Sequence, residues 1–190
     1  MSNLSEMLEQ QSAKGELAAA AAKAVAALAG AAVSIADVIR TPDLAADLGT
    51  MRGTANADGD DQKALDVIAD DMIHRALSEV GDVAAYLSEE QDNALPIHEG
   101  GTVIVASDPL DGSSNIDTNV SIGTIFSILP ASGGLLQPGT QQLAAGFIVY
   151  GPQTTLLVSF GQSVMAYQLG KDGQFHDMGW DVSIPATTTE

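Results

Sequence analysis

A short β-branched run that leads into two closely spaced aspartates constrains this chain more than any other feature. Residues 103–105 are Val-Ile-Val, which indicates a buried strand, and Asp108 and Asp111 follow within six positions. Pro109 lies between them, fixes its own φ angle and has no N–H group to donate. The sequence therefore predicts a strand that ends in a sharp turn, with the Leu110 carbonyl directed the same way as the two carboxylates.

The turn residues carry the chemistry of a metal and phosphate site. Carboxylate and carbonyl oxygens are the ligands that magnesium takes from proteins, and its remaining ligands come from water or a substrate phosphate. The backbone N–H groups of Gly112, Ser113 and Ser114 can form a nest for a phosphoryl group. A solvated Asx-type turn uses the same residue types, so the spacing of the two aspartates alone fits either interpretation.

The distribution of helical and strand patterns predicts the fold class. Helical patterns dominate before residue 80, with a run of helix formers over 16–29 between Gly15 and Gly30, and strand patterns dominate after residue 119. Expected strands cover 83–87, 103–105, 121–129, 143–150, 154–159, 163–169 and 174–178, with a polar connector over 91–101. We therefore expect a layered α/β (α+β) fold, in which N-terminal helices pack on a mixed, largely antiparallel sheet.

The same patterns predict how the chain is organised. An N-terminal helical segment covers 1–42, a mobile loop 43–59, an α/β domain 60–184, and the start of a linker 185–190. Residues 17–33 are apolar enough to suggest a signal peptide or a membrane span. They are mostly alanine, however, contain Lys23 and follow a polar leader that contains acids, which favours a packed or interfacial helix.

Charge and cysteine content exclude several classes of partner. The chain has 25 acidic and 7 basic residues, a formal net charge of −18, so nucleic acid and anionic membrane surfaces are not expected partners. It has no cysteine, which excludes a disulfide framework and thiolate metal sites and fits a cytoplasmic protein.

Acidic residues recur at the predicted ends of helices and strands: Asp60, Asp66, Glu89, Glu90, Asp108 and Asp111. Strands that end at the same edge of an α/β sheet bring such groups together. Clustered carboxylates repel one another unless cations neutralise them, so this layout favours metal binding. Taken singly, a Glu-Glu pair is typical of a solvated surface, and an aspartate within a helix is typical of a cap or an ion pair.

Three stretches, in order and spacing, resemble the class I fructose-1,6-bisphosphatases. They are Gly-Asp-Asp-Gln-Lys-Ala-Leu-Asp-Val at 59–67, Ser-Glu-Glu at 88–90, and the string 108–117 followed by 121–126. That family lies within the lithium-sensitive, magnesium-dependent phosphatase superfamily, and the resemblance extends from about residue 56 to residue 180. It implies the sugar-phosphatase fold and a phosphoric monoester hydrolase that converts fructose 1,6-bisphosphate to fructose 6-phosphate, in gluconeogenesis or the Calvin cycle.

The resemblance also implies a role for each matching residue. The expected ligands of two or three magnesium ions are Glu89, Asp108, the Leu110 carbonyl and Asp111. The expected catalytic residues are Asp60, which assists the leaving oxygen, and Asp66 and Glu90, which position and deprotonate the attacking water. The expected site for the 1-phosphate is Asp111, Gly112, Ser113 and Ser114.

The chain also departs from the family. Relatives continue well past its length, and the resemblance places the sugar pocket and the basic grip on the second phosphate in that further part. We therefore expect an N-terminal portion with a missing C-terminal domain, weak activity alone and exposed apolar surface. Residues 31–33 and 102–103 differ from the AMP-binding positions of relatives, so an AMP site is expected to be absent, whereas a homotetramer is expected by resemblance.

Two alternatives to this function remain open from the sequence. Similar proteins act on sedoheptulose 1,7-bisphosphate. The sugar-pocket residues that would discriminate between this substrate and fructose 1,6-bisphosphate are not in this sequence. An inactive truncated domain that acts only in subunit association is the other alternative. An inositol monophosphatase is disfavoured, because relatives of that type usually have Thr where Ser113 and Ser114 follow Asp-Gly.

Overall fold

The computed structural model describes residues 3–41, 60–180, 182–183 and 187, apart from the side chains of residues 60–64 and 117. The expected mobile loop over 43–59 and nearly all of the expected linker over 185–190 therefore lie outside the described residues. The described helices are α1 (Leu4–Ser12), α2 (Glu16–Arg40) and α4 (Asp60–Ser78). Three short 3-10 helices follow: η1 (Ser113–Thr118), η2 (Ala131–Gly133) and η3 (Gly139–Gln141).

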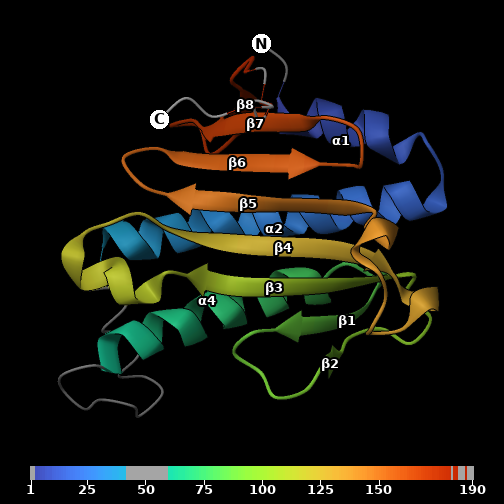
Figure 1. Ribbon diagram of the computed structural model, residues 1–190, viewed down its shortest axis with the longest axis horizontal. Coiled ribbons are helices and arrows are strands. Elements are labelled where there is room, and N and C mark those ends of the chain that lie inside the picture. Colours follow the sequence, from blue (N-terminus) through green and yellow to red (C-terminus); the bar gives the residue numbers. More distant parts are fainter. Residues whose placement is uncertain (1–2, 42–59, 181, 184–186, 188–190) are drawn as a thin grey trace.

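The described strands form one eight-stranded sheet at the centre of the fold, in the order β2-β1-β3-β4-β5-β6-β7-β8 (Figure 1). Its strands are β1 (Val83–Ser88), β2 (Leu95–Pro96), β3 (Val103–Asp111), β4 (Ile122–Pro130), β5 (Ala144–Tyr150), β6 (Thr154–Ser159), β7 (Val164–Leu169) and β8 (Phe175–Asp177). β1 and β3 pair in parallel, and every other neighbouring pair is antiparallel. The predicted mixed, largely antiparallel sheet is confirmed.

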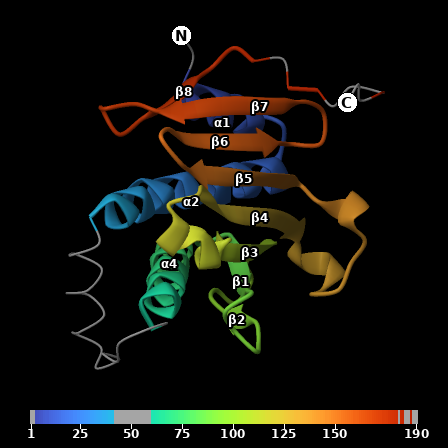
Figure 2. The same cartoon turned by 60° about the vertical axis from the view of Figure 1, so that its left-hand side comes forward.

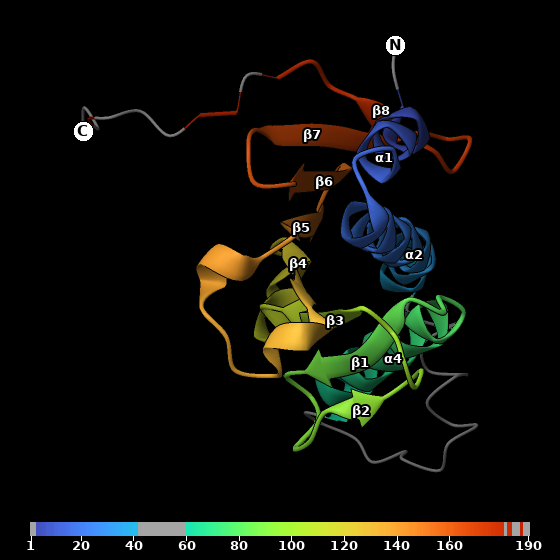
Figure 3. The ribbon, with the colours of Figure 1, turned by 90° about the vertical axis from the view of Figure 1, so that its right-hand side faces the viewer.

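The α-helices α1, α2 and α4 lie on one face of the sheet, as the end-on view shows (Figure 3). α2 is long and apolar enough to cross a membrane by length and composition alone. Its buried side chains are mostly alanine, together with Val25, Leu28 and Ile35, and they belong to the same core cluster as the buried residues of β3, β4 and β5. Small side chains let the helix approach the strands closely, so α2 is a packed core helix, as predicted.

Gly30, which follows the predicted run of helix formers over 16–29, lies inside a continuous helix. α2 runs without a break from Glu16 to Arg40 because Gly30 lies on its exposed side and the buried alanines on either side hold the helix on the sheet. Tertiary packing here overrides the weak helix propensity of one glycine.

Replacing Gly30 by Ala is expected to raise the free energy of unfolding by about 0.5–1 kcal/mol, because alanine loses less backbone entropy in a helix. A Cβ atom at this position meets no neighbouring atom within 4 Å. Urea denaturation followed by circular dichroism measures the change. Gly15→Ala is the matched control and should destabilise, because Gly15 precedes the same helix with a φ of 133°. A loss of stability in Gly30→Ala would contradict this prediction.

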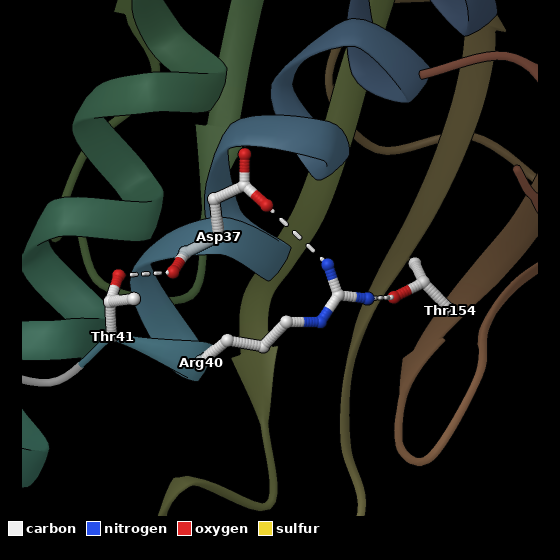
Figure 4. Close-up of polar contacts among 4 residues, drawn as sticks. All are labelled: Asp37, Arg40, Thr41 and Thr154. Atoms are coloured by element: carbon white, nitrogen blue, oxygen red, sulfur yellow. Dashed lines mark hydrogen bonds and ion pairs between the residues drawn. The ribbon is translucent and has the colours of Figure 1, made fainter. Parts of the chain in front are cut away.

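A hydrogen bond connects the C-terminal end of α2 to strand β6 of the sheet (Figure 4). The Arg40 guanidinium donates a hydrogen bond of 2.9 Å to the Thr154 hydroxyl at the start of β6. It also forms an ion pair of 3.4 Å with Asp37, and the Thr41 hydroxyl donates to the Asp37 carbonyl. Thr154 is buried, so its bond to Arg40 fixes where the helix ends relative to the strands.

β3 is longer than predicted, and the expected sharp turn at Pro109 is wrong. The strand continues through Pro109 to Asp111, and its pairing with β4 becomes irregular between Asp108 and Asp111. A proline, which has no N–H, is tolerated at such an irregularity. The Thr124 hydroxyl donates to the Pro109 carbonyl at 2.8 Å and holds this stretch against β4. The chain turns later, at Gly112.

The expected polar connector over 91–101 also contains a strand. β2 pairs antiparallel with β1, with Tyr86 opposite Leu95 and Ala85 opposite Pro96. A two-residue strand with a proline has little strand signal in the sequence, and it lies at the edge of the sheet, where proline is tolerated.

The opposite face of the sheet carries no α-helix among the described residues (Figure 3). Apolar side chains from three strands are exposed there: Ile125 at 46%, Phe147 at 42% and Val164 at 38%. They line a groove of about 640 Å³ that reaches Glu89 and Asp108 at one end. Exposed apolar surface of this kind agrees with the expectation from the sequence.

Candidate functional site

The parallel pairing of β1 and β3 brings two acidic segments to the same edge of the sheet. Ser88 lies opposite Ser107 in the pairing, and the Glu89 N–H donates to the Ser107 carbonyl at 3.0 Å. Glu89 and Asp108 therefore leave adjacent strands side by side. In Figure 1 the arrowheads of β1 and β3 point the same way, toward the beginning of α4. The expected juxtaposition of these two groups is confirmed.

Glu89 and Glu90 lie on a tight turn directly after β1. The Gln91 N–H donates to the Ser88 carbonyl at 3.2 Å, and the Glu90 N–H contacts the Ser88 hydroxyl at 3.2 Å. Glu89 is exposed, whereas Glu90 is half-buried. The two neighbouring carboxylates thus experience different environments, one exposed to water and one partly shielded from it.

Asp66 comes to the site from the first half of α4. Figure 2 shows α4 beside β1 and β3, with residues 113–118 in yellow next to it, and α4 contacts both strands and η1. The Asp66 carboxylate faces the Ser113 hydroxyl. Burial raises the pKa of Asp66, the hydrogen bond from Ser113 lowers it, and the charges of Asp108 and Glu89 raise it further. Asp66, Glu89, Asp108 and Ser113 therefore belong to one site.

Mutual repulsion also acts on Asp108 and Glu90. Burial and the charges of Asp111 and Glu89 raise the pKa of Asp108, against a hydrogen bond from the Leu110 N–H at 3.1 Å that lowers it. Burial, with the charges of Asp66 and Glu89, raises the pKa of Glu90. Each of these carboxylates is disfavoured as an anion by its neighbours, which is the electrostatic pattern of a site for a cation.

The turn after β3 begins at Gly112, which adopts the left-handed conformation with a φ of 79°. Ser113 then opens η1, so one left-handed residue leads directly into helical ones, a combination that can direct successive N–H groups into a concavity. Asp111, the last residue of β3, is exposed beside a cavity of about 220 Å³ that Gly112 also lines. Such a concavity suits an anion that is held next to metal ligands.

The donor set fits a hard cation in its chemistry, although the side chains are not gathered into a finished metal site. Carboxylate oxygens from Glu89, Asp108 and Asp111 are the ligands that magnesium prefers. Within the described residues, no three His, Asp or Glu side chains lie close enough together to hold a metal ion. Glu89 and Asp111 are exposed, so their side chains can turn inward around a cation. Asp60 is the first residue of α4, and its side chain lies outside the described part.

Asp108→Asn is expected to stabilise the protein in a metal chelator at pH 7.5. A raised pKa means that the folded state favours protonated Asp108, so the stability from this group is present at low pH and lost as the pH rises through the folded pKa. Asparagine removes the charge and can still accept from the Leu110 N–H. The thermal midpoint should therefore rise, and the gain should shrink as the pH falls toward 4.

Added magnesium is expected to have the opposite effect on the stability difference between the wild type and Asp108→Asn. Added magnesium should raise the midpoint of the wild type and have a smaller effect on Asp108→Asn, because the variant lacks one anionic ligand. Calorimetric scans at several pH values, with chelator or with magnesium, measure both effects. A variant that is less stable than the wild type in chelator at pH 7.5 would contradict the assigned repulsion.

Sequence reasoning missed a buried polar network directly beneath the Glu89–Glu90 turn. Asp70 is only 3% exposed, yet both of its carboxylate oxygens accept hydrogen bonds, from the Tyr86 hydroxyl at 2.9 Å and from the Gln91 amide at 2.7 Å. Tyr86 is fully buried and stacks on His74, with ring centroids 6.1 Å apart. The available signal was the position of Asp70, one helical turn after Asp66 and in line with buried Ile73 and Leu77.

Comparison with known proteins agrees with this geometry. Residues 3–178 match the family model described as fructose-1-6-bisphosphatase, N-terminal domain. Fructose-1,6-bisphosphatase class 1 of Azorhizobium caulinodans is 47% identical over 98% of this chain and 60% of its own length. A second class 1 protein, from Cereibacter sphaeroides, is 53% identical over 86% of this chain and 50% of its own length.

A solved structure shows the same fold. The crystal structure of Leishmania major fructose-1,6-bisphosphatase in holo form superposes with a TM-score of 0.74 at 30% identity, over 89% of this chain and 53% of that one. The chain thus spans between one half and three fifths of the length of these relatives.

Proposed function

The chain belongs to the fructose-1,6-bisphosphatase family, whose N-terminal domain its residues 3–178 match, and we propose that the protein hydrolyses the 1-phosphate of fructose 1,6-bisphosphate to give fructose 6-phosphate. The observation that carries this proposal is the meeting of Glu89 and Asp108 at one sheet edge, with Asp66 and Ser113 facing them from α4 and η1. Water supplies the incoming oxygen, and the sugar alkoxide leaves with a proton.

The metal ligands in this proposal are Glu89, Asp108, the Leu110 carbonyl and Asp111, around two or three magnesium ions. Magnesium, when bound, contributes neutralisation of the phosphoryl charge and of the leaving oxygen. The raised pKa of Asp108 supports the assignment, because a cation removes the repulsion from Asp111 and Glu89. The Asp111 to Ser114 turn holds the 1-phosphate through its N–H groups, while the Ser113 hydroxyl donates to Asp66.

Asp66 and Glu90 orient the attacking water and accept its proton in this mechanism. Burial raises the pKa of both groups, which brings them closer to the range in which a carboxylate is an effective base at neutral pH. Asp60 is assigned to the leaving oxygen from its place in the motif at the start of α4.

The second phosphate and the sugar ring need basic and polar groups that this chain supplies sparsely. It has only seven Lys and Arg residues, and the described Arg40 is already engaged by Asp37 and Thr154. We assign that part of the site to chain beyond the N-terminal domain. We further propose a cytoplasmic homotetramer without an AMP site, acting in gluconeogenesis or the Calvin cycle.

Phosphate release from fructose 1,6-bisphosphate tests the proposal, with sedoheptulose 1,7-bisphosphate and inositol 1-phosphate as comparison substrates. The assay is run on the 190-residue chain and on its longest natural reading frame, each with magnesium and with a chelator. Release from fructose 1,6-bisphosphate should require magnesium and exceed release from inositol phosphate by at least tenfold. A preference for sedoheptulose 1,7-bisphosphate would replace the assigned substrate, and no release from either sugar bisphosphate would overturn the function.

A further inference from the structure

The buried carboxylate of Asp70 connects the two elements that carry the proposed catalytic acids. It belongs to α4, one helical turn after Asp66, and it accepts hydrogen bonds from two residues of the segment that carries Glu89 and Glu90. The Tyr86 hydroxyl donates from within β1, and the Gln91 amide donates from the residue directly after Glu90. One side chain therefore holds both ends of the 86–91 segment against the helix.

Each of these bonds restricts a different motion of the Glu89–Glu90 turn. Tyr86 is fully buried, so its bond fixes the last part of β1 relative to α4. Gln91 is exposed apart from its contact with Asp70, so without that contact the far end of the turn would be held by its backbone alone. The Gln91 N–H bond to the Ser88 carbonyl closes the turn but does not connect it to the helix.

A carboxylate at this position has a cost that apolar packing would avoid. Burying a polar group away from water is unfavourable unless every oxygen is satisfied, and here Tyr86 and Gln91 together supply both donors. Leucine at position 70 would fit the same helix face as buried Ile73 and Leu77. The carboxylate therefore contributes something other than core packing, and the groups that it contacts indicate what this is.

We propose that Asp70 is a positioning residue, which holds Glu89 and Glu90 at a fixed distance from Asp66 through its hydrogen bonds to Tyr86 and Gln91. Asp70 contacts neither the metal nor the substrate. The inference rests on the proposed function for its catalytic readout, and on magnesium binding for a second readout that does not need turnover. Residues that orient metal ligands in this way typically change metal affinity or activity by about 10- to 100-fold when they are removed.

The choice of substitution separates hydrogen bonding from charge. Asp70→Leu removes both bonds, and Gln91→Leu removes only the bond at the exposed end of the turn. Asp70→Asn keeps both bonds if the Gln91 amide turns over, because the new NH₂ group can donate to the Gln91 oxygen. Gln91→Glu places two carboxylates together and breaks the contact. The double variant Asp70→Asn with Gln91→Glu restores the hydrogen bond with donor and acceptor exchanged, because the amide of residue 70 then donates to the carboxylate of residue 91.

The test measures kcat, KM for fructose 1,6-bisphosphate and the magnesium dissociation constant, in the longest natural reading frame. Asp70→Leu and Gln91→Leu should lower kcat and weaken magnesium binding by about tenfold or more, with KM within about twofold. Asp70→Asn and the reversed pair should stay within about threefold of the wild type. Asp92→Asn, an exposed charge loss beside Gln91, is the control and should change nothing.

The outcomes distinguish this inference from the proposed function. If Asp70→Leu does not fold, Gln91→Leu and the reversed pair decide the question, because position 91 is exposed. If the wild type is active and Gln91→Leu has the same kcat and the same magnesium affinity as the wild type, the positioning role is overturned. A wild type that binds magnesium but hydrolyses neither sugar bisphosphate would overturn the proposed reaction. Weaker magnesium binding in Gln91→Leu would still support the positioning role in that case.

Discussion

Replacing Asp66 by Asn is expected to lower kcat for fructose 1,6-bisphosphate by roughly 10²- to 10⁴-fold, the range for loss of a general base. Asparagine has nearly the same shape and can still accept from the Ser113 hydroxyl that faces Asp66. It cannot accept a proton from water. The fold should stay intact, and its stability in chelator should rise slightly, because one of the repelling carboxylates is gone.

Steady-state kinetics with saturating magnesium, together with thermal unfolding, measure both consequences of Asp66→Asn. Glu79→Gln is the matched control, because Glu79 is an exposed acid just past the end of the same helix. It removes the same charge at a distance from the site. A kcat for Asp66→Asn within tenfold of the wild type would contradict the assigned role, whatever the variant does to stability.

Ile128→Ala is expected to lower the free energy of unfolding by about 2–5 kcal/mol, because it removes a fully buried side chain from the core and leaves a cavity. Ile128 is 0% exposed and faces the helices from β4. Ile125 lies on the same strand but faces the open side of the sheet, where 46% of it is exposed. Ile125→Ala should cost less than about 1 kcal/mol in the 190-residue chain.

This pair compares one substitution on the two faces of a single strand, so strand propensity cancels between the two variants. Urea unfolding of both gives the difference directly. If chain beyond residue 190 covers the open face, Ile125→Ala should cost more in the longest natural reading frame than in the 190-residue chain. Equal losses for Ile125→Ala and Ile128→Ala in the 190-residue chain would contradict the described asymmetry of the sheet.

Local patterns were sufficient to predict most of the secondary structure. Strand β6 was expected at 154–159 and has those bounds, because a short run rich in β-branched and apolar residues lies between Gly- and Pro-containing turns. Strands β1, β5 and β7 differ from expectation by one residue at one end, and β4 by one residue at each end. Pro109 misled the prediction, because an irregular strand pairing accommodates a proline within β3. Strand β2 has only two residues, one of them proline, which is too short for a detectable strand pattern in the sequence.

The candidate site was predictable only where its residues form motifs. Glu89 and Asp108 were expected to meet because both follow neighbouring strands, and the parallel pairing of β1 and β3 brings them together. Asp70 was not found, because its importance depends on which side chains lie opposite it in three dimensions. Tyr86 and Gln91 are 16 and 21 residues away in sequence, and no spacing rule connects them to a helix.

The central claim, that the carboxylates of Asp66, Glu89, Glu90, Asp108 and Asp111 form a magnesium-dependent phosphatase site, is tested most directly by identifying the product. Phosphorus NMR of fructose 1,6-bisphosphate, incubated with the longest natural reading frame and magnesium, follows each phosphate separately. The expected result is loss of the 1-phosphate signal alone, growth of inorganic phosphate, an unchanged 6-phosphate, and no reaction in chelator. Loss of the 6-phosphate, or equal hydrolysis with and without magnesium, would contradict the account.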